Sequence, residues 1–206
     1  MSSEKYFYPQ KMGRIILQAM EEIMGANGRN AVLRLGELGH LIDKVPPSRP
    51  DNSFPFETVS AIQVALELAY GPRGGRGIAL RVGRATFKNG LKEYGSILGL
   101  TEMAFGMLPL PTKIHSGATA FAELFNKYTD QKVRLEEKGN TILWHIDRCP
   151  LCWGRKSEDV VCHLAVGLLQ ESLYWVSGGK EFHVEETACI ARGDSTCTMV
   201  IDQTPL

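Results

Sequence analysis

Five cysteines lie close together near one end of this chain, and their thiols are its most chemically versatile side chains. Cys149 and Cys152 form a CxxC pair, and Cys162, Cys189 and Cys197 follow, whereas the first 148 residues contain no cysteine. Thiolates are preferred ligands of Zn²⁺, and a CxxC pair often supplies two of the four ligands of a zinc site. The clustering therefore favours a metal centre over scattered structural thiols.

The spacing around Gly193 predicts that two of these thiols face each other. Residues 182–190 and 196–201 alternate between apolar and polar types, and turn-forming residues lie between them. A hairpin here places Cys189 opposite Cys197, with Cβ atoms about 5 Å apart. That separation suits two ligands of one ion, because Zn–S bonds are about 2.3 Å long. Cys162 is expected to open a helix, and the CxxC pair precedes it, so four of the five thiols could meet at one point.

Three other interpretations of the thiols stay open. A disulfide between Cys189 and Cys197 fits the hairpin but not a reducing compartment, which we expect because the chain begins without a secretory signal. Buried thiols can also be inert. An Fe–S cluster is compatible with CxxC and further cysteines. We place structural zinc first, inert thiols second and an Fe–S cluster third.

The composition is that of an ordinary globular protein. Of 206 residues, 44% are apolar, and 23 basic side chains balance 23 acidic ones, so no overall positive field exists to attract nucleic acid. No apolar run approaches the ~20 residues that span a bilayer. We therefore expect a cytoplasmic protein with no nucleic acid partner and no membrane span.

Hydrophobic periodicity predicts an α+β fold, in which an antiparallel sheet of about four strands packs with helices. One domain over 1–206 is expected, with a mainly helical part at 1–128 and a zinc- and ligand-binding part at 130–204. Two strands are expected around a turn at Gly139–Asn140, before the final hairpin. The predicted helices and the one long loop among them are 12–24 ending at Gly25, 56–70, a flexible Gly/Arg loop at 71–77, 84–98, 112–128 and 159–176.

The C-terminal third resembles the 4-vinyl reductase-like domain family. The resemblance covers roughly residues 130–204 and rests on several short motifs: Cys152–Trp153–Gly154, Val161–Cys162–His163–Leu164, Gly167–Leu168–Leu169, Val184–Glu185–Glu186–Thr187–Ala188–Cys189 and Ala191–Arg192–Gly193–Asp194–Ser195–Thr196–Cys197. This family is similar to the sensor domains of bacterial aromatic-responsive activators and to TRAPP core subunits. The resemblance implies a TRAPP-like/NO-signalling ligand-binding fold whose helices enclose an apolar pocket, and which usually forms homodimers.

The resemblance also implies a ligand set for structural Zn²⁺. In the sensor branch, cysteines matching Cys162, Cys189 and Cys197 bind zinc together with an acidic residue upstream. This chain has no clear acidic match there, so Cys152 is expected as the fourth ligand, with Cys149 as the alternative. Of the pair Glu185–Glu186, one side chain is expected on the covered side of the sheet, as a partner at the metal.

A hydrophobic small molecule is the expected ligand of this domain, acting as a sensor, carrier or accessory protein. A tetrapyrrole, as in bacteriochlorophyll metabolism, is among the candidate ligands. A sensor of this kind needs a downstream protein partner. The candidate pocket residues are Trp144, His145, Trp175, Phe105, Met107 and Phe121, each of which also has a plain packing or surface interpretation.

An enzymatic role has little support, because the chain carries no dinucleotide fingerprint, flavin motif or recognisable acid/base pair. Two alternatives to ligand binding stay open. One is a subunit of a vinyl-group reductase in (bacterio)chlorophyll synthesis, which would need a bound redox cofactor. The other is a TRAPP-type protein-assembly module, which would expose a large apolar patch.

Overall fold

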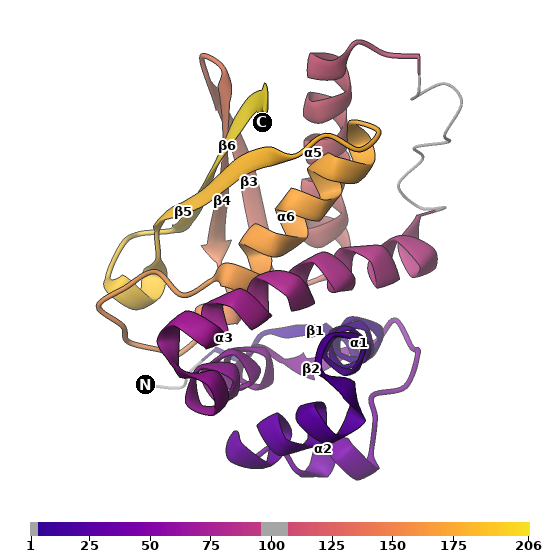
Figure 1. Ribbon diagram of the computed structural model, residues 1–206, viewed down its shortest axis with the longest axis vertical. Coiled ribbons are helices and arrows are strands. Elements are labelled where there is room, and N and C mark those ends of the chain that lie inside the picture. The colour runs from indigo at the N-terminus through magenta and orange to yellow at the C-terminus, as the bar shows by residue number, and fades with distance from the viewer. Residues whose placement is uncertain (1–3, 96–106) are drawn as a thin grey trace.

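A four-stranded antiparallel sheet covered on one face by helices forms the C-terminal half of the chain (Figure 1). The computed structural model describes residues 4–95 and 107–206. The predicted α+β class is confirmed. The helices are α1 (Gln10–Leu35), α2 (His40–Asp43), α3 (Phe56–Tyr94), α5 (Leu110–Tyr128) and α6 (His163–Val176), with short 3₁₀ turns η1 (Pro150–Cys152) and η2 (Ile190–Arg192).

The main sheet has the strand order β3-β4-β6-β5. Its strands are β3 (Lys132–Lys138), β4 (Thr141–Arg148), β5 (Phe182–Ala188) and β6 (Cys197–Pro205). Both predicted hairpins are present, and their turns contain Gly139 and Gly193 at positive φ values of 62° and 103°. A separate two-stranded sheet pairs β1 (Phe7–Pro9) with β2 (Asn52–Pro55), which the periodicity did not predict because both strands are very short.

Two helical predictions in the first half need correction, and glycine explains both. Gly25 ends a helical segment at φ 71°, as predicted, but the chain resumes helix and continues to Leu35. The expected loop at 71–77 is wrong: only Gly71 leaves helical geometry, and the helix continues from Pro72. Gly75 explains the error, because a Cβ there would lie 2.8 Å from the Cα of Glu67. These glycines allow close packing and do not mark a flexible loop.

The last predicted helix begins later than expected. Helix α6 starts at His163 and not near Asp159, because the backbone N–H of Cys162 donates a hydrogen bond to Oε2 of Glu186 at 2.7 Å. That bond holds residue 162 just outside the helix. The expected helix at 84–98 is described as far as Tyr94.

Helices α3 and α6 cross with their backbones in contact. A Cβ on Gly83 would lie 2.1 Å from the carbonyl oxygen of Leu164, and one on Gly167 would lie 2.0 Å from that of Leu80. The two glycines thus set the distance between the helices that flank both the thiols and the apolar core. Figure 1 shows α6 between the sheet and α3.

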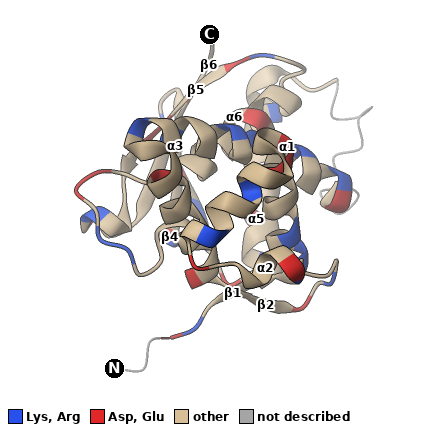
Figure 2. Cartoon of the chain, turned by 60° about the horizontal axis from the view of Figure 1, so that its bottom comes forward, with Lys and Arg blue, Asp and Glu red and all other residues tan. Residues whose placement is uncertain are grey.

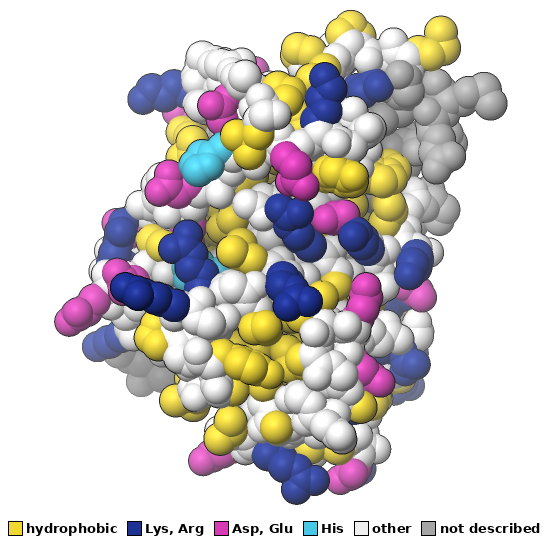
Figure 3. Space-filling model, in the orientation of Figure 1, with side chains coloured by type: hydrophobic (Ala, Val, Ile, Leu, Met, Phe, Trp, Pro, Cys, Tyr) yellow, Lys and Arg dark blue, Asp and Glu magenta, His cyan; other side chains and the backbone are white. Residues whose placement is uncertain are grey.

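The surface carries charges of both signs. Basic and acidic side chains are interspersed along the helices in Figure 2 and across the face in Figure 3. Among the described residues, no helix combines the length and apolarity needed to cross a membrane.

Candidate metal centre and ligand cavity

All five thiols converge at the end of the sheet where α6 begins. Each cysteine sits at an element boundary, and none is more than 1% exposed. Cys149 and Cys152 flank η1 after β4, Cys162 precedes α6, Cys189 follows β5, and Cys197 opens β6. Residues far apart in the sequence therefore meet because the strands and α6 all end at this point.

The sulfur atoms are spaced like the corners of a metal coordination tetrahedron. The Sγ atoms of Cys149 and Cys162 are 3.5 Å apart, and those of Cys152 and Cys197 are 3.4 Å apart. Cys162 lies 3.7 Å from Cys197 and 3.8 Å from Cys189, and Cys189 lies 4.0 Å from Cys197. Four sulfurs at about 2.3 Å from one Zn²⁺ would be about 3.8 Å apart. The observed spacing fits one ion between the thiols.

This spacing also bears on the Fe–S alternative. In a [4Fe–4S] cube the ligand sulfurs lie outside the iron–sulfide core, so they are farther apart than the four ligands of a single ion. The sulfur contacts given above are too short to surround such a core. They support a mononuclear or closely bridged metal site, and the donor set does not by itself define which metal binds.

Two overlapping groups of donors have all their ligand atoms within 4.8 Å of one another. The first contains Cys149, Cys152, Cys162 and Cys197. The second contains Cys162, Cys197, Cys189 and the carboxylate of Glu186. The structure thus brings the alternative ligand Cys149 into the same group as Cys152, and it places Cys189 in the other group.

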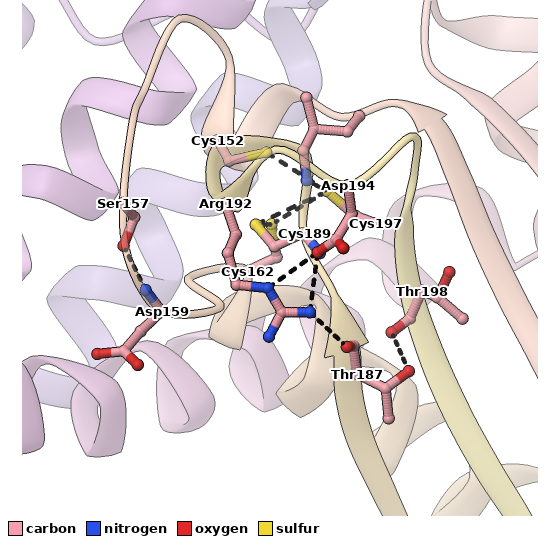
Figure 4. Close-up of polar contacts among 11 residues, drawn as sticks. Cys152, Ser157, Asp159, Cys162, Thr187, Cys189, Arg192, Asp194, Cys197 and Thr198 are labelled. Carbon is pink, nitrogen blue, oxygen red and sulfur yellow. Dashed lines mark hydrogen bonds and ion pairs between the residues drawn. The ribbon is translucent and has the colours of Figure 1, made fainter.

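A hydrogen-bonded turn positions Cys189 beside Cys197 (Figure 4). Oδ2 of Asp194 accepts from the backbone N–H of Cys189 at 2.8 Å and from Nε of Arg192 at 2.9 Å. The N–H of Ile190 points at Sγ of Cys197 at 3.3 Å. Backbone N–H groups directed at sulfur favour its thiolate form, which is the form that binds metal.

Glu186 is the acidic side chain on the covered side of the sheet. It is 7% exposed, whereas Glu185 next to it points to solvent. Burial, and then the neighbouring Cys189, raises the pKa of Glu186 to about 9. Its Oε2 accepts from Cys162, but its buried Oε1 has no hydrogen-bond partner among the described residues. A buried carboxylate oxygen without a partner, next to thiols, is what a metal ligand looks like before the ion binds.

His163 lies outside both donor groups. Burial, reinforced by Arg76, lowers its pKa to about 4. The side chain follows Cys162 on a different face of the first turn of α6, as the rotation of about 100° per residue requires.

An apolar cavity of about 90 Å³ lies between the helices and the sheet, beside the thiols. Aromatic rings form much of its wall. Phe121 packs against Phe87, Phe125 and Trp144, with ring centroids 5.6, 5.0 and 5.6 Å apart. Such tilted and edge-on arrangements are the favourable ones for aromatic pairs and suit a further ring between them.

The cavity shares residues with the thiol segments. Leu151, between Cys149 and Cys152, is part of its wall, and so is Leu164, two residues after Cys162. Fixing the thiols therefore fixes one wall of the cavity.

The pocket candidates from the sequence fall in different places. Trp144 and Phe121 line the cavity. Trp175 does not, but its ring lies 6.3 Å from that of Phe87, which does. Met107 is 87% exposed. Phe105 lies outside the described residues.

His145 points to the face of the sheet opposite Trp144, since neighbouring residues in a strand alternate. Its Nδ1 lies 2.9 Å from Oγ1 of Thr198, and its Nε2 lies 3.4 Å from Glu136. These contacts match the plain interpretation of a satisfied core histidine.

Two polar groups in the cavity wall were missed by the sequence reasoning. The hydroxyls of Thr86 and Tyr94 are buried, and neither has a hydrogen-bond partner among the described residues. Burial, and then Glu93, raises the pKa of Tyr94, so its hydroxyl stays protonated and can donate. In contrast, Tyr8 already donates to Gln131. No sequence signal distinguishes these two hydroxyls, because each sits in an ordinary amphipathic helix.

The fold and the thiol centre together define an α+β domain of the kind that encloses small ligands. Residues 144–203 match the 4-vinyl reductase-like domain family, so this chain contains a domain of that family, and the predicted resemblance is confirmed. The match begins at Trp144 and covers all five cysteines. Comparison with functionally curated proteins gives no match.

Solved structures extend the fold comparison to nearly the whole chain. An H-NOX protein from S. oneidensis in the Fe(II)NO state is 13% identical, with 94% of this chain and 98% of that chain covered and a TM-score of 0.58. The unliganded Fe(II) H-NOX protein from K. algicida is 14% identical, at 94% and 95% coverage and a TM-score of 0.55. The phenol-responsive sensory domain of the transcription activator PoxR, solved with phenol, is 13% identical, at 71% and 73% coverage and a TM-score of 0.50. Identities this low establish a shared fold alone.

Proposed function

We propose that this domain is a sensor that takes up a small aromatic molecule in the cavity between α1, α3, α5, α6 and the sheet. The observation that carries the proposal is an apolar, aromatic-walled cavity with two buried hydroxyls that lack partners among the described residues. A ligand with one ring and one hydroxyl would fill the apolar space and satisfy a buried polar group, whose unpaired state costs about 1–3 kcal/mol. The phenol-responsive sensory domain of PoxR has the same fold, which supports this class of ligand.

The size of the cavity favours a single ring over a tetrapyrrole. An engineered apolar cavity of about 150 Å³ binds benzene, and sites for larger ligands measure about 300–1,000 Å³. At about 90 Å³, this cavity needs a small outward movement of side chains for one ring. A tetrapyrrole would need the helices to separate, so we rank bacteriochlorophyll intermediates and vinyl reduction below aromatic sensing.

In this proposal the metal is structural Zn²⁺. It would be held by the buried thiols, where it would supply charge to fix the loops that carry them. With thiolates at every ligand position, such an ion has no site for water and does no catalysis. Leu151 and Leu164 are attached to those loops, so the metal would keep one cavity wall in place for the ligand.

The hydroxyls provide the sharpest test of the proposed ligand class. The double variant Thr86→Val/Tyr94→Phe is expected to weaken phenol binding by about 5-fold for each hydrogen bond lost, at about 1 kcal/mol each. Toluene has the same ring but no hydroxyl, so its affinity should be unchanged. Isothermal titration calorimetry of both compounds measures the difference.

The matched control is Tyr70→Phe, which removes a hydroxyl from the same helix at a side chain that is 42% exposed. It should bind phenol like the wild type. Equal phenol affinity in the double variant and the wild type would contradict a hydroxyl-binding site in this cavity.

A further inference from the structure

The number of donors at the thiol centre exceeds what one ion can use. A tetrahedral Zn²⁺ site takes four ligands. Here five thiols and the Glu186 carboxylate converge, all of them buried. A single ion would leave one thiol and one carboxylate buried beside it with no role, and Oε1 of Glu186 has no hydrogen-bond partner among the described residues.

The arrangement of the two donor groups resolves this excess. Each group has four members, and the two share Cys162 and Cys197. Two four-coordinate ions need eight ligand positions, and six donors fill eight positions only when two of them bridge. Thiolate sulfur has enough lone pairs to bridge two ions, as the Zn₂Cys₆ modules illustrate.

We propose that this site binds two divalent metal ions, with the thiolates of Cys162 and Cys197 bridging them. Cys149 and Cys152 complete the first ion, and Cys189 and Glu186 complete the second. Binding of the two ions does not depend on the proposed aromatic ligand.

The sulfur distances match two tetrahedra that share an edge. The shared edge, from Cys162 to Cys197, measures 3.7 Å. The outer thiols of Cys149 and Cys152 are each in contact with one bridging sulfur, at 3.5 and 3.4 Å. Cys189 is in contact with both, at 3.8 and 4.0 Å. All of these lie near the edge of about 3.8 Å expected for Zn–S tetrahedra.

Charge balance is also acceptable for two ions. Five thiolates and one carboxylate carry six negative charges, of which two divalent ions neutralise four. The remainder equals that of one Zn²⁺ in four thiolates, a common structural site. The N–H groups of Ile190 and Cys162, directed at a bridging sulfur and at Glu186, stabilise part of this remaining charge.

The test is metal stoichiometry by native mass spectrometry of the full chain saturated with zinc, together with ¹¹³Cd NMR of the cadmium-loaded protein. Two ions per chain are expected, and two ¹¹³Cd resonances split by mutual coupling through the shared sulfurs. One ion per chain at saturation, or two uncoupled resonances, would overturn the proposal.

Variants separate the two positions while keeping a folded protein to measure. Glu186→Gln and Cys189→Ala should each bind one ion, held by the first group, and Glu185→Gln is the matched control that should still bind two. If Glu186→Gln also binds two ions with the coupling intact, the second position is wrongly assigned. A failure of phenol binding with two bridged ions present would count against the proposed function and leave the two-ion site standing.

Discussion

Protein carrying Cys197→Ser is expected to purify without tightly bound metal and to unfold at a midpoint lower by at least about 10 °C. Cys197 belongs to both donor groups and is fully buried. Because metal binding at such a site is coupled to folding, its loss removes several kcal/mol of stability. For a domain of this size, 1 kcal/mol corresponds to about 2–4 °C. Elemental analysis and thermal unfolding followed by circular dichroism measure both effects.

Two controls separate the metal from the substitution itself. Wild-type protein treated with a strong chelator should unfold near the midpoint of Cys197→Ser. Thr198→Ser, a conservative change at the next position of β6, keeps the hydroxyl that contacts His145 and should retain its metal. A Cys197→Ser protein with full metal content and the wild-type midpoint would refute a metal centre at these thiols.

The second large effect is expected at the crossing of α3 and α6. Gly167→Ala should destabilise the protein by about 3 kcal/mol or more, because the new Cβ would lie 2.0 Å from the carbonyl oxygen of Leu80. The contact is with backbone, so no side-chain rotation relieves it. The helices must separate, and the cavity wall formed by Ala165 and Leu168 moves with them. Urea unfolding measures the change in free energy.

Gly77→Ala is the matched control on α3. A Cβ there would meet none of the described residues within 4 Å, and alanine is the better helix former. It should leave stability unchanged or raise it by up to about 1 kcal/mol. Equal stability of Gly167→Ala and the wild type would show that the two helices do not pack as described.

The sequence predicted the elements whose pattern is local. Alternation identified both hairpins, and the turn residues placed Gly139 and Gly193 correctly. Gly25 was correctly predicted to end a helical segment, but composition alone made 71–77 look flexible. Nothing local reveals that Gly75 lies against the backbone of Glu67, since that contact exists only after the chain reverses at Gly71.

The metal centre was predictable as a cluster but not as a coordination geometry. The concentration of cysteines and the hairpin register brought Cys189 and Cys197 together in advance. The choice between Cys149 and Cys152 depended on η1, which directs both thiols to the same point. A search for an upstream acid did not find Glu186, because that residue follows Cys162 in the chain and reaches the thiols from the neighbouring strand.

The central claim is that the cavity binds a small aromatic molecule, and calorimetric titration with phenol of the wild type, Gly90→Leu and Gly77→Leu tests it most directly. Gly90 lines the cavity, and a Cβ there meets none of the described residues within 4 Å, so leucine can occupy the space without a clash. Gly77 is equally open on the same helix but lies away from the cavity. The account predicts one phenol per chain for the wild type and Gly77→Leu, and none for a folded Gly90→Leu. Phenol binding that is absent from the wild type, or unchanged in Gly90→Leu, would contradict it.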